Sequence, residues 1–187
     1  MNTIQWEEIA NQKIPHKDFK LSYNNKTKII ECKTDSHYNS PNLVIELISS
    51  ININACNIIE NIPLYKLITP KNNNYHTLTN IITKCLKKEI KGKLGYGMNE
   101  TTKPNYVLSY MFYKENCNVK HLLINGLTLK HFINNNNQYE LYPLTITKTT
   151  NNNNIWFTIS SLIPIKDLKI KLGKNIKCIM WDNNKNT

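Results

Sequence analysis

The chain has 187 residues, enough for one domain with a substantial hydrophobic core. It contains 24 lysines and no arginine against 13 acidic residues, which gives a formal net charge of +11. This excess favours a polyanionic partner, with nucleic acid ahead of a membrane surface, although an AT-rich genome would also raise the lysine content. The five cysteines are widely spaced without a Cys-x-x-Cys pair, which argues against a disulfide framework or zinc ribbon and favours reduced thiols inside a cell.

The N-terminal residues lack the apolar core of a signal peptide, and no apolar run is long enough to span a membrane. We therefore expect a soluble intracellular protein of the cytoplasm or nucleus, without a membrane partner. A single domain is expected over residues 1–187. Residues 51–74 form a probable insertion in it, since apolar residues recur there at mixed spacings.

The first expected element is a short helix over residues 3–11, stopped by Pro15. A β-hairpin follows, with one strand over residues 17–23 and a second, more apolar strand over residues 28–35, joined by an Asn-rich turn. After a polar link, a third strand is expected over residues 42–48. Periodicity thus predicts that the N-terminal quarter of the chain is largely β-structure.

The clearest expected helix covers residues 75–91, where apolar residues recur at helical spacing and Gly92 follows as a natural C-cap. Leu94–Met98, by contrast, has two glycines and is expected to be a flexible turn. The remaining expected elements are strands over 104–113, 118–124, 140–149, 155–162 and 176–181, and short helices over 127–133 and 164–172, the latter capped by Ser160 or Ser161. This order predicts an α/β or α+β fold with a mixed central sheet flanked by helices.

The expected hairpin carries the most informative residues, Asp18 near the start of its first strand and Glu31 and Lys33 near the end of its second. Side chains alternate along a strand, so Glu31 and Lys33 share one face and Cys32 lies on the other. If Asp18 pairs opposite them, two carboxylates and one ammonium converge, and these carboxylates suit a hard cation such as Mg²⁺ or Mn²⁺. The alternative interpretation is a solvated strand face with cross-strand ion pairs.

This hairpin resembles the active-site hairpin of the PD-(D/E)xK nuclease superfamily, in which an Asp and a later Glu-x-Lys hydrolyse nucleic-acid phosphodiesters. Residues 30–35 (Ile-Glu-Cys-Lys-Thr-Asp) and 42–46 (Asn-Leu-Val-Ile-Glu) resemble phage and restriction-type members. Residues 95–97 and 101–108 resemble the segment that precedes the next core strand in such proteins. The chain departs from the pattern at Pro41, where glycine is common, and in having no proline directly before the aspartate.

The resemblance implies a restriction-endonuclease-like core and a viral or mobile-element setting. It implies that Asp18 and Glu31 hold the metal together with the backbone carbonyl of Cys32. In the same way, Lys33 would orient or deprotonate the attacking water. An acidic residue from the preceding helix often points at the metal in that family, and Glu8 (or its neighbour Glu7) is the candidate here, although acids in a first turn also complement the helix dipole.

Further residues are possible additions to the site. Glu46 is a lone acid on an otherwise apolar strand face, where it would shape the metal's water shell or simply face an edge. His37 follows the catalytic strand and would meet a phosphate or remain solvated. Four lysines near the end of the expected helix would follow a nucleic-acid backbone or only suit the helix dipole, namely Lys84, Lys87, Lys88 and Lys91.

The leading prediction is a Mg²⁺-dependent endonuclease that acts on nucleic acid, with DNA favoured. Cutting both strands of a duplex would make a homodimer attractive. The first alternative is a non-catalytic nucleic-acid-binding or virion-associated protein, which predicts salt-sensitive binding without cleavage. The second is a structural or assembly protein whose charge reflects genome composition and whose apolar interface involves residues 51–68.

Overall fold

The computed structural model divides into two compact units. The first unit comprises Met1–Pro41, Thr101–Leu129 and Leu168–Thr187, and the second comprises Asn42–Glu100 and Lys130–Asp167. The single domain expected from the length, with its insertion, stays a prediction, and each unit is described by itself. The residues that the structure describes are 5–8, 18–35, 39–51, 59, 62–64, 66–98, 106–113, 119–151 and 154–181.

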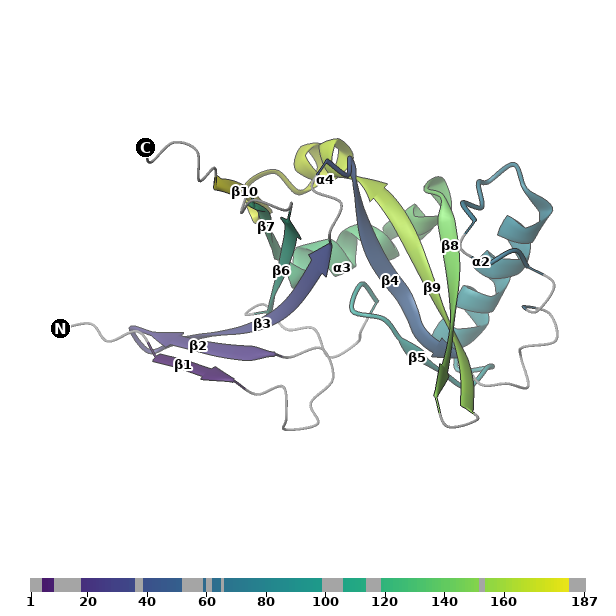
Figure 1. Ribbon diagram of the computed structural model, residues 1–187, viewed down its shortest axis with the longest axis horizontal. Helices are drawn as coiled ribbons and strands as arrows, with labels where there is room; N and C mark the ends of the chain where they lie inside the picture. The colour runs from purple at the N-terminus through teal and green to yellow at the C-terminus, as the bar shows by residue number, and fades with distance from the viewer. Residues whose placement is uncertain are drawn as a thin grey trace. The chain divides into compact units, whose positions relative to one another are not determined.

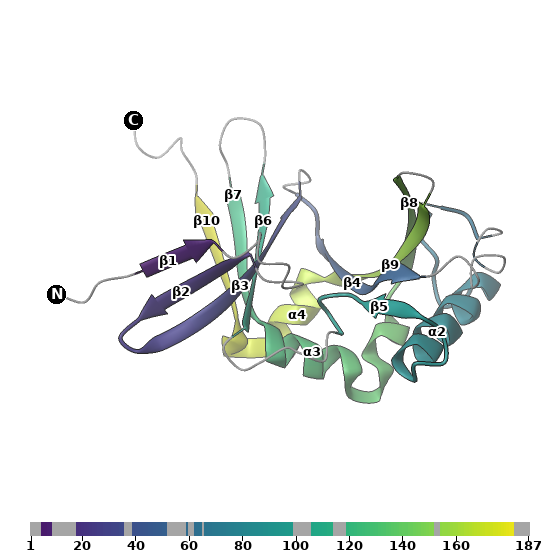
Figure 2. The ribbon, with the colours of Figure 1, turned by 90° about the horizontal axis from the view of Figure 1, so that it is seen from below.

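The first unit is built on a six-stranded sheet, in the order β1-β2-β3-β6-β7-β10 (Figure 1). Strands β3 and β6 are parallel, and the other neighbours are antiparallel. Figure 2 shows β6, β7 and β10 side by side. The bounds are β1 Gln5–Glu8, β2 Phe19–Tyr23, β3 Lys26–Asp35, β6 Tyr106–Tyr113, β7 Val119–Asn125 and β10 Ile176–Trp181. The mixed sheet that the sequence predicts is therefore confirmed.

The β2–β3 hairpin is confirmed, and its turn fixes the register between the two strands. Asn24 and Asn25 both have positive φ angles, 47° and 58°. Two such residues between paired strands form the type I′ turn, which matches the twist of a hairpin, and asparagine tolerates this conformation. The tight turn pairs Tyr23 with Lys26 and, further along the ladder, Phe19 with Ile30.

The helix expected over residues 3–11 is wrong, because Gln5–Glu8 forms strand β1 along the edge of β2. Three apolar residues suggested a helix, Ile4, Trp6 and Ile9, but the first two are two positions apart, a spacing that suits a strand equally well. Pairing with β2 then decides the outcome, since tertiary contacts override a weak local preference.

One face of the six-stranded sheet holds the apolar core of the first unit. Leu108 and Phe112 on β6 are fully buried, and so are Leu122 and Ile124 on β7. Glu31 is registered against Leu108, and Leu108 against Ile124, so Glu31 lies on this same face. We call it the site face.

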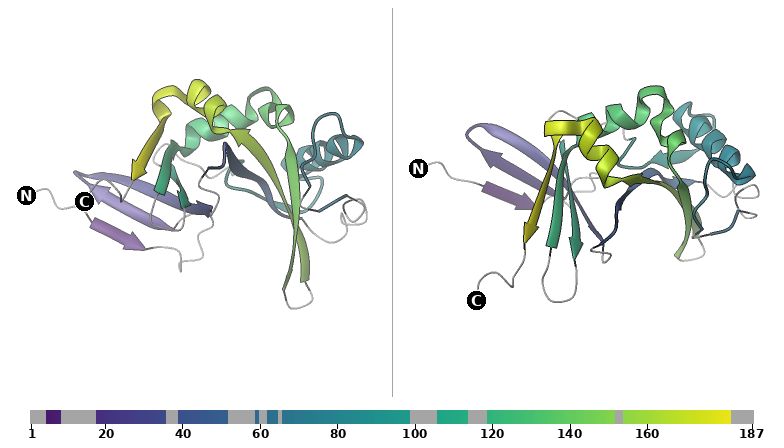
Figure 3. Two further views of the ribbon diagram at one scale, coloured as in Figure 1. Left: turned by 45° about the horizontal axis from the view of Figure 1, so that its top comes forward. Right: turned by 90° about the horizontal axis from the view of Figure 1, so that it is seen from above.

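The second unit is built on a four-stranded antiparallel sheet, in the order β5-β4-β9-β8. Figure 3 shows the long β8–β9 hairpin of this sheet. Its bounds are β4 Asn42–Ile51, β5 Gly92–Leu94, β8 Leu144–Asn151 and β9 Asn154–Pro164. The sequence predicts β4, but in one central sheet. That placement is wrong, because β4 pairs with β5 and β9, and sheet membership depends on such distant partners.

Helix α2 (Asn73–Leu86) packs five residues of one face into the core of the second unit, namely Tyr75, Leu78, Ile81, Ile82 and Cys85. The helical periodicity is thus confirmed, but the expected end at residue 91 is wrong. Lys87 caps the helix, and Lys88 has a φ angle of +61°, which no right-handed helix accommodates. Gly92, expected to cap the helix, instead begins β5.

Helices α3 (Gly126–Asn134) and α4 (Ile165–Leu172) each cross the division between the units. Both were expected, but Ser160 and Ser161 lie within β9 and do not cap α4. Two short 3-10 helices complete the chain, η3 (Asn135–Leu141) and η4 (Gly173–Asn175). Among the described residues, no helix is long and apolar enough to cross a membrane.

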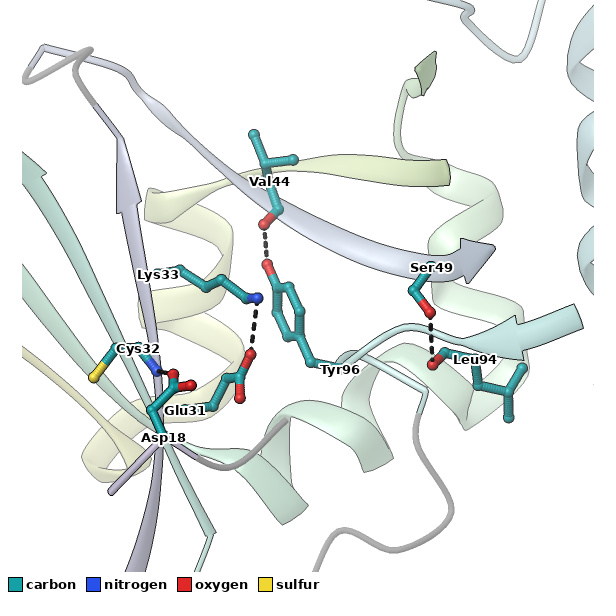
Figure 4. Close-up of polar contacts among 8 residues, drawn as sticks. All are labelled: Asp18, Glu31, Cys32, Lys33, Val44, Ser49, Leu94 and Tyr96. Atoms are coloured by element: carbon teal, nitrogen blue, oxygen red, sulfur yellow. Dashed lines mark hydrogen bonds and ion pairs between the residues drawn. The ribbon is translucent and has the colours of Figure 1, made fainter. Parts of the chain in front are cut away.

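The turn expected at Leu94–Met98 is present, with the Met98 nitrogen donating to the Gly95 carbonyl at 3.0 Å, and its two glycines lie against β4. Backbone nitrogens of Gly95 and Gly97 donate to the carbonyls of Leu47 and Glu46, at 2.8 Å and 3.0 Å. The Tyr96 hydroxyl donates to the Val44 carbonyl (Figure 4). A Cβ on Gly95 would lie 2.4 Å from the Glu46 carbonyl oxygen, so the close approach requires glycine.

Replacing Tyr75 by phenylalanine is expected to destabilise the second unit by about 1–3 kcal/mol. Its hydroxyl lies 3.1 Å and 2.9 Å from the carbonyl oxygens of Tyr139 and Tyr142, both within the core. Phenylalanine would remove this donor from both oxygens, and the Tyr139 oxygen would keep only its long 3.3 Å contact from the Tyr142 nitrogen. Urea unfolding of both proteins at pH 7 would measure the difference.

The same pair of proteins carries a pH test. Burial, and then the Glu140 and Tyr139 charges, raise the pKa of Tyr75 to about 12. Because this value exceeds the unfolded value near 10, the contribution of the neutral hydroxyl is full below pH 10 and is lost as pH rises toward 12. The stability gap between wild type and Tyr75→Phe should therefore narrow between pH 10 and 12. A gap that stays constant would contradict this assignment.

Candidate metal-binding site

Asp18 lies at the end of the β2–β3 ladder, where regular pairing stops. It immediately precedes β2, and its backbone nitrogen donates to the Ile30 carbonyl at 2.9 Å. Phe19, the next residue, is registered with Ile30 as well. Two residues of this strand thus face one residue of β3, as in a β-bulge. Figure 4 shows the Asp18 and Glu31 side chains beside one another at this end of the hairpin, and the metal site itself stays a prediction.

Glu31 is a buried carboxylate, with only 3% of the residue exposed. Its Oε1 lies 2.8 Å from the Nζ of Lys33, whose side chain is 30% exposed. The ion pair joins two residues of one strand and one face, as alternation requires. With the nearby Asp18, the cluster holds two carboxylates and one ammonium, and so carries a net negative charge beside the apolar core of the site face.

Asp18 is held in place by the backbone of the second strand. Its Oδ2 accepts a hydrogen bond from the Cys32 nitrogen at 2.7 Å, and Figure 4 shows this contact beside the Lys33–Glu31 pair. Carbonyls of alternate residues point to the same side of a strand. The Cys32 carbonyl therefore points to the same side as the Ile30 carbonyl, which faces Asp18. This end of the hairpin thus offers two kinds of oxygen ligand, side-chain carboxylate and backbone carbonyl.

The Cys32 thiol belongs to the opposite face, and Figure 4 shows its sulfur directed away from the carboxylates. It is registered against Ser109 and interacts with that hydroxyl, and Ser109 Oγ lies 2.8 Å from His121 Nε2. Burial raises the pKa of the Cys32 thiol and lowers the pKa of His121. A neutral thiol and a neutral imidazole therefore lie on the face of the sheet opposite the carboxylates. Cys32 contributes to the candidate site only through its backbone.

The donor set fits a hard divalent cation. Asp18 and Glu31 supply carboxylate oxygens, and Cys32 supplies a backbone carbonyl on the same side of the strand. Mg²⁺ needs only one or two protein carboxylates, because waters and substrate phosphate complete its coordination. No group of three or more His, Cys, Asp or Glu side chains suited to a metal occurs among the described residues. A structural zinc site would need such a group, whereas a magnesium site does not.

No protein-family model, curated protein or solved structure gives a significant match to the chain.

The other predicted site residues lie elsewhere. Glu8 is in β1, registered against Phe19, and not on the helix expected to carry it. Glu46 is half-buried on β4 of the second unit, and His37 lies outside the described residues. The predicted lysines are exposed at the end of α2 and after it, also in the second unit: Lys84, Lys87, Lys88 and Lys91. Their roles stay predictions.

Sequence reasoning missed the residues that line the site face on the neighbouring strands. Tyr110 is registered against Lys33, and Phe112 against Asp35 and Lys120. The two rings pack 4.9 Å apart and are buried. Alternation along the strand over residues 104–113 gives the signal that Tyr110 and Phe112 share a face, but which face requires the β3–β6 register.

Proposed function

We propose that this protein hydrolyses phosphodiester bonds of nucleic acid in a metal-dependent reaction. The observation that supports the proposal is the buried Glu31 carboxylate, with the Lys33 ammonium 2.8 Å away and the Asp18 carboxylate beside it (Figure 4). Two carboxylates close together repel one another. A bound cation would remove this repulsion, and carboxylate oxygens are the ligands that Mg²⁺ prefers.

Each residue of the cluster has a defined role in this proposal. Asp18 and Glu31 hold the cation together with the Cys32 carbonyl, and the Cys32 nitrogen fixes the orientation of Asp18 through its hydrogen bond. Lys33 orients the attacking water and offsets the negative charge that develops on the phosphate. When bound, the cation supplies Lewis-acid activation and lowers the pKa of its water.

The charge of the chain supports nucleic acid as the substrate. A formal net charge of +11, carried entirely by lysines, favours contact with phosphates and not the reading of bases by arginine forks. We therefore propose an endonuclease of low sequence specificity, and DNA is the favoured substrate. A homodimer with two such sites would cut both strands of a duplex.

The first test is cleavage of supercoiled plasmid, single-stranded DNA and single-stranded RNA with Mg²⁺, Mn²⁺ or EDTA. Nicking or strand cleavage that requires the metal is expected, and a Glu31→Gln preparation purified identically reports any contaminating nuclease. Salt-sensitive binding without cleavage under every condition would favour the non-catalytic nucleic-acid-binding protein. Neither binding nor cleavage would favour the structural protein.

A further inference from the structure

Lys120 lies on the site face, two strands away from the carboxylates. Asp35 at the end of β3 is registered against Phe112 on β6, and Phe112 against Lys120 on β7. Directly opposite residues share a face, and neighbouring strands are about 4.8 Å apart. The Cα atoms of Asp35 and Lys120 are therefore about 10 Å apart. Asp35 and Phe112 lie two residues further along their strands than the registered pair Lys33 and Tyr110, on the same face.

The Lys120 side chain lies over the strand between it and β3. Its Nζ is 4.3 Å from the centroid of the Phe112 ring, a cation–π contact. The Phe112 ring packs against Tyr110, the register partner of Lys33. Two buried aromatic rings thus lie between the two lysines, and the ammonium of Lys120 is held against the nearer ring.

The ammonium of Lys120 is only partly compensated. It donates to the Ser40 carbonyl at 3.0 Å, and in the described part of the chain it has no carboxylate at ion-pair distance. An ammonium carries three donors, so this contact uses one of them. Burial is the main cause that lowers the pKa of Lys120, and the charge of Lys169 on α4 lowers it further, whereas the Cys178 thiol and Asp35 raise it.

A half-buried cation with a second cation nearby and no close carboxylate favours an anion. Cations in such a position are stabilised when an anionic ligand enters, because the ligand replaces the hydration that burial has removed. The site face already holds the residues proposed to act on a phosphodiester. A neighbouring phosphate of the same strand is the anion that this position would meet.

We propose that Lys120 binds a phosphate of the nucleic-acid strand that neighbours the phosphate to be cleaved. This inference rests on the proposed function and deepens it, since it extends the site from β3 across β6 to β7. The recognised chemistry is the phosphodiester backbone, which DNA and RNA share, so the two are separate arms of the test.

The test compares three variants with wild type: Lys120→Met, Lys120→Arg and Lys177→Met. Binding of fluorescein-labelled single-stranded DNA and of single-stranded RNA is measured at several salt concentrations. Melting curves of each variant measure its folding. Lys177 is the matched control, because it is exposed on β10 and registered against Leu123, on the opposite face. We expect Lys120→Met to weaken binding about 3- to 10-fold and to reduce the salt slope by about 0.7–0.9. Lys120→Arg should retain wild-type binding, and Lys177→Met should leave the slope unchanged.

Equal effects of Lys120→Met and Lys177→Met would overturn the inference, because the lost charge would then act only through net charge. A lower melting temperature of Lys120→Met with an unchanged salt slope would also overturn the inference. Lys120 would then have only a structural role, through its hydrogen bond to the Ser40 carbonyl. Wild-type cleavage is measured in parallel. If wild type cleaves but Lys120→Met and Lys177→Met weaken binding equally, only the phosphate contact is rejected. If only Lys120→Met reduces the salt slope and wild type does not cleave, the hydrolytic function is rejected and the phosphate contact is retained.

Discussion

Replacing Glu31 by glutamine is expected to lower metal-dependent cleavage at least about 10²-fold while the protein remains folded. Glutamine keeps the size of the side chain and an oxygen that can accept from Lys33, but it removes the negative charge that holds the cation. The change also removes a negative charge beside the Asp18 carboxylate, which Figure 4 draws next to Glu31. We therefore expect the free energy of unfolding in EDTA to change by less than about 1 kcal/mol.

Metal binding gives a second measurement that does not depend on activity. A ligand that binds only the folded state at ten times its Kd adds about 1.4 kcal/mol to the free energy of unfolding. Wild type should gain stability with rising Mg²⁺ or Mn²⁺, and Glu31→Gln should not. The matched control is Glu89→Gln, the same chemical change at an exposed residue of the second unit, which should behave like wild type. Equal metal stabilisation of wild type and Glu31→Gln would show that the cation binds elsewhere.

The hairpin could be predicted because it is local. Alternation places Glu31 and Lys33 on one face, and Asn24-Asn25 permits a two-residue turn. Such a turn pairs Tyr23 with Lys26, and counting outward from this pair leads to Phe19 opposite Ile30, one residue from Asp18 and from Glu31. The register of a hairpin thus follows from the length of its turn, and the position of Asp18 near Glu31 follows from that register.

Features that depend on distant partners could not be predicted in the same way. The N-terminal segment suits a helix or a strand by pattern, and pairing with β2 makes it a strand. Strand β4 is evident from its alternation, but its sheet is set by β9, more than a hundred residues later. The position of Lys120 on the site face follows only from two strand registers, β3 with β6 and β6 with β7, and neither can be read from the sequence.

Replacing Lys33 by methionine is expected to separate catalysis from metal binding. The change keeps an unbranched side chain of similar length and removes the ammonium next to Glu31. Cleavage should fall at least about 10²-fold, because the water loses its orienting group and the phosphate loses a compensating charge. Mg²⁺ stabilisation should persist or increase, since a positive charge beside the carboxylates has been removed. This outcome for the metal is the reverse of that expected for Glu31→Gln.

The stability of Lys33→Met should depend on the metal. In EDTA, Glu31 is left buried without its ammonium partner, which is expected to cost about 1–3 kcal/mol, less than for a fully buried pair because Lys33 is 30% exposed. Saturating Mg²⁺ should recover most of this loss. Lys28→Met is the control, an exposed lysine of the same strand whose pairing with Leu21 places it on the opposite face.

The two variants together distinguish the roles in the cluster. If Lys33→Met loses both cleavage and metal stabilisation, as Glu31→Gln should, Lys33 is needed to build the site and takes no separate part in the reaction. If it cleaves at the wild-type rate, the ammonium only neutralises Glu31. Loss of cleavage with retained metal binding is the result that assigns Lys33 to the reaction, because no purely structural ion pair predicts that combination.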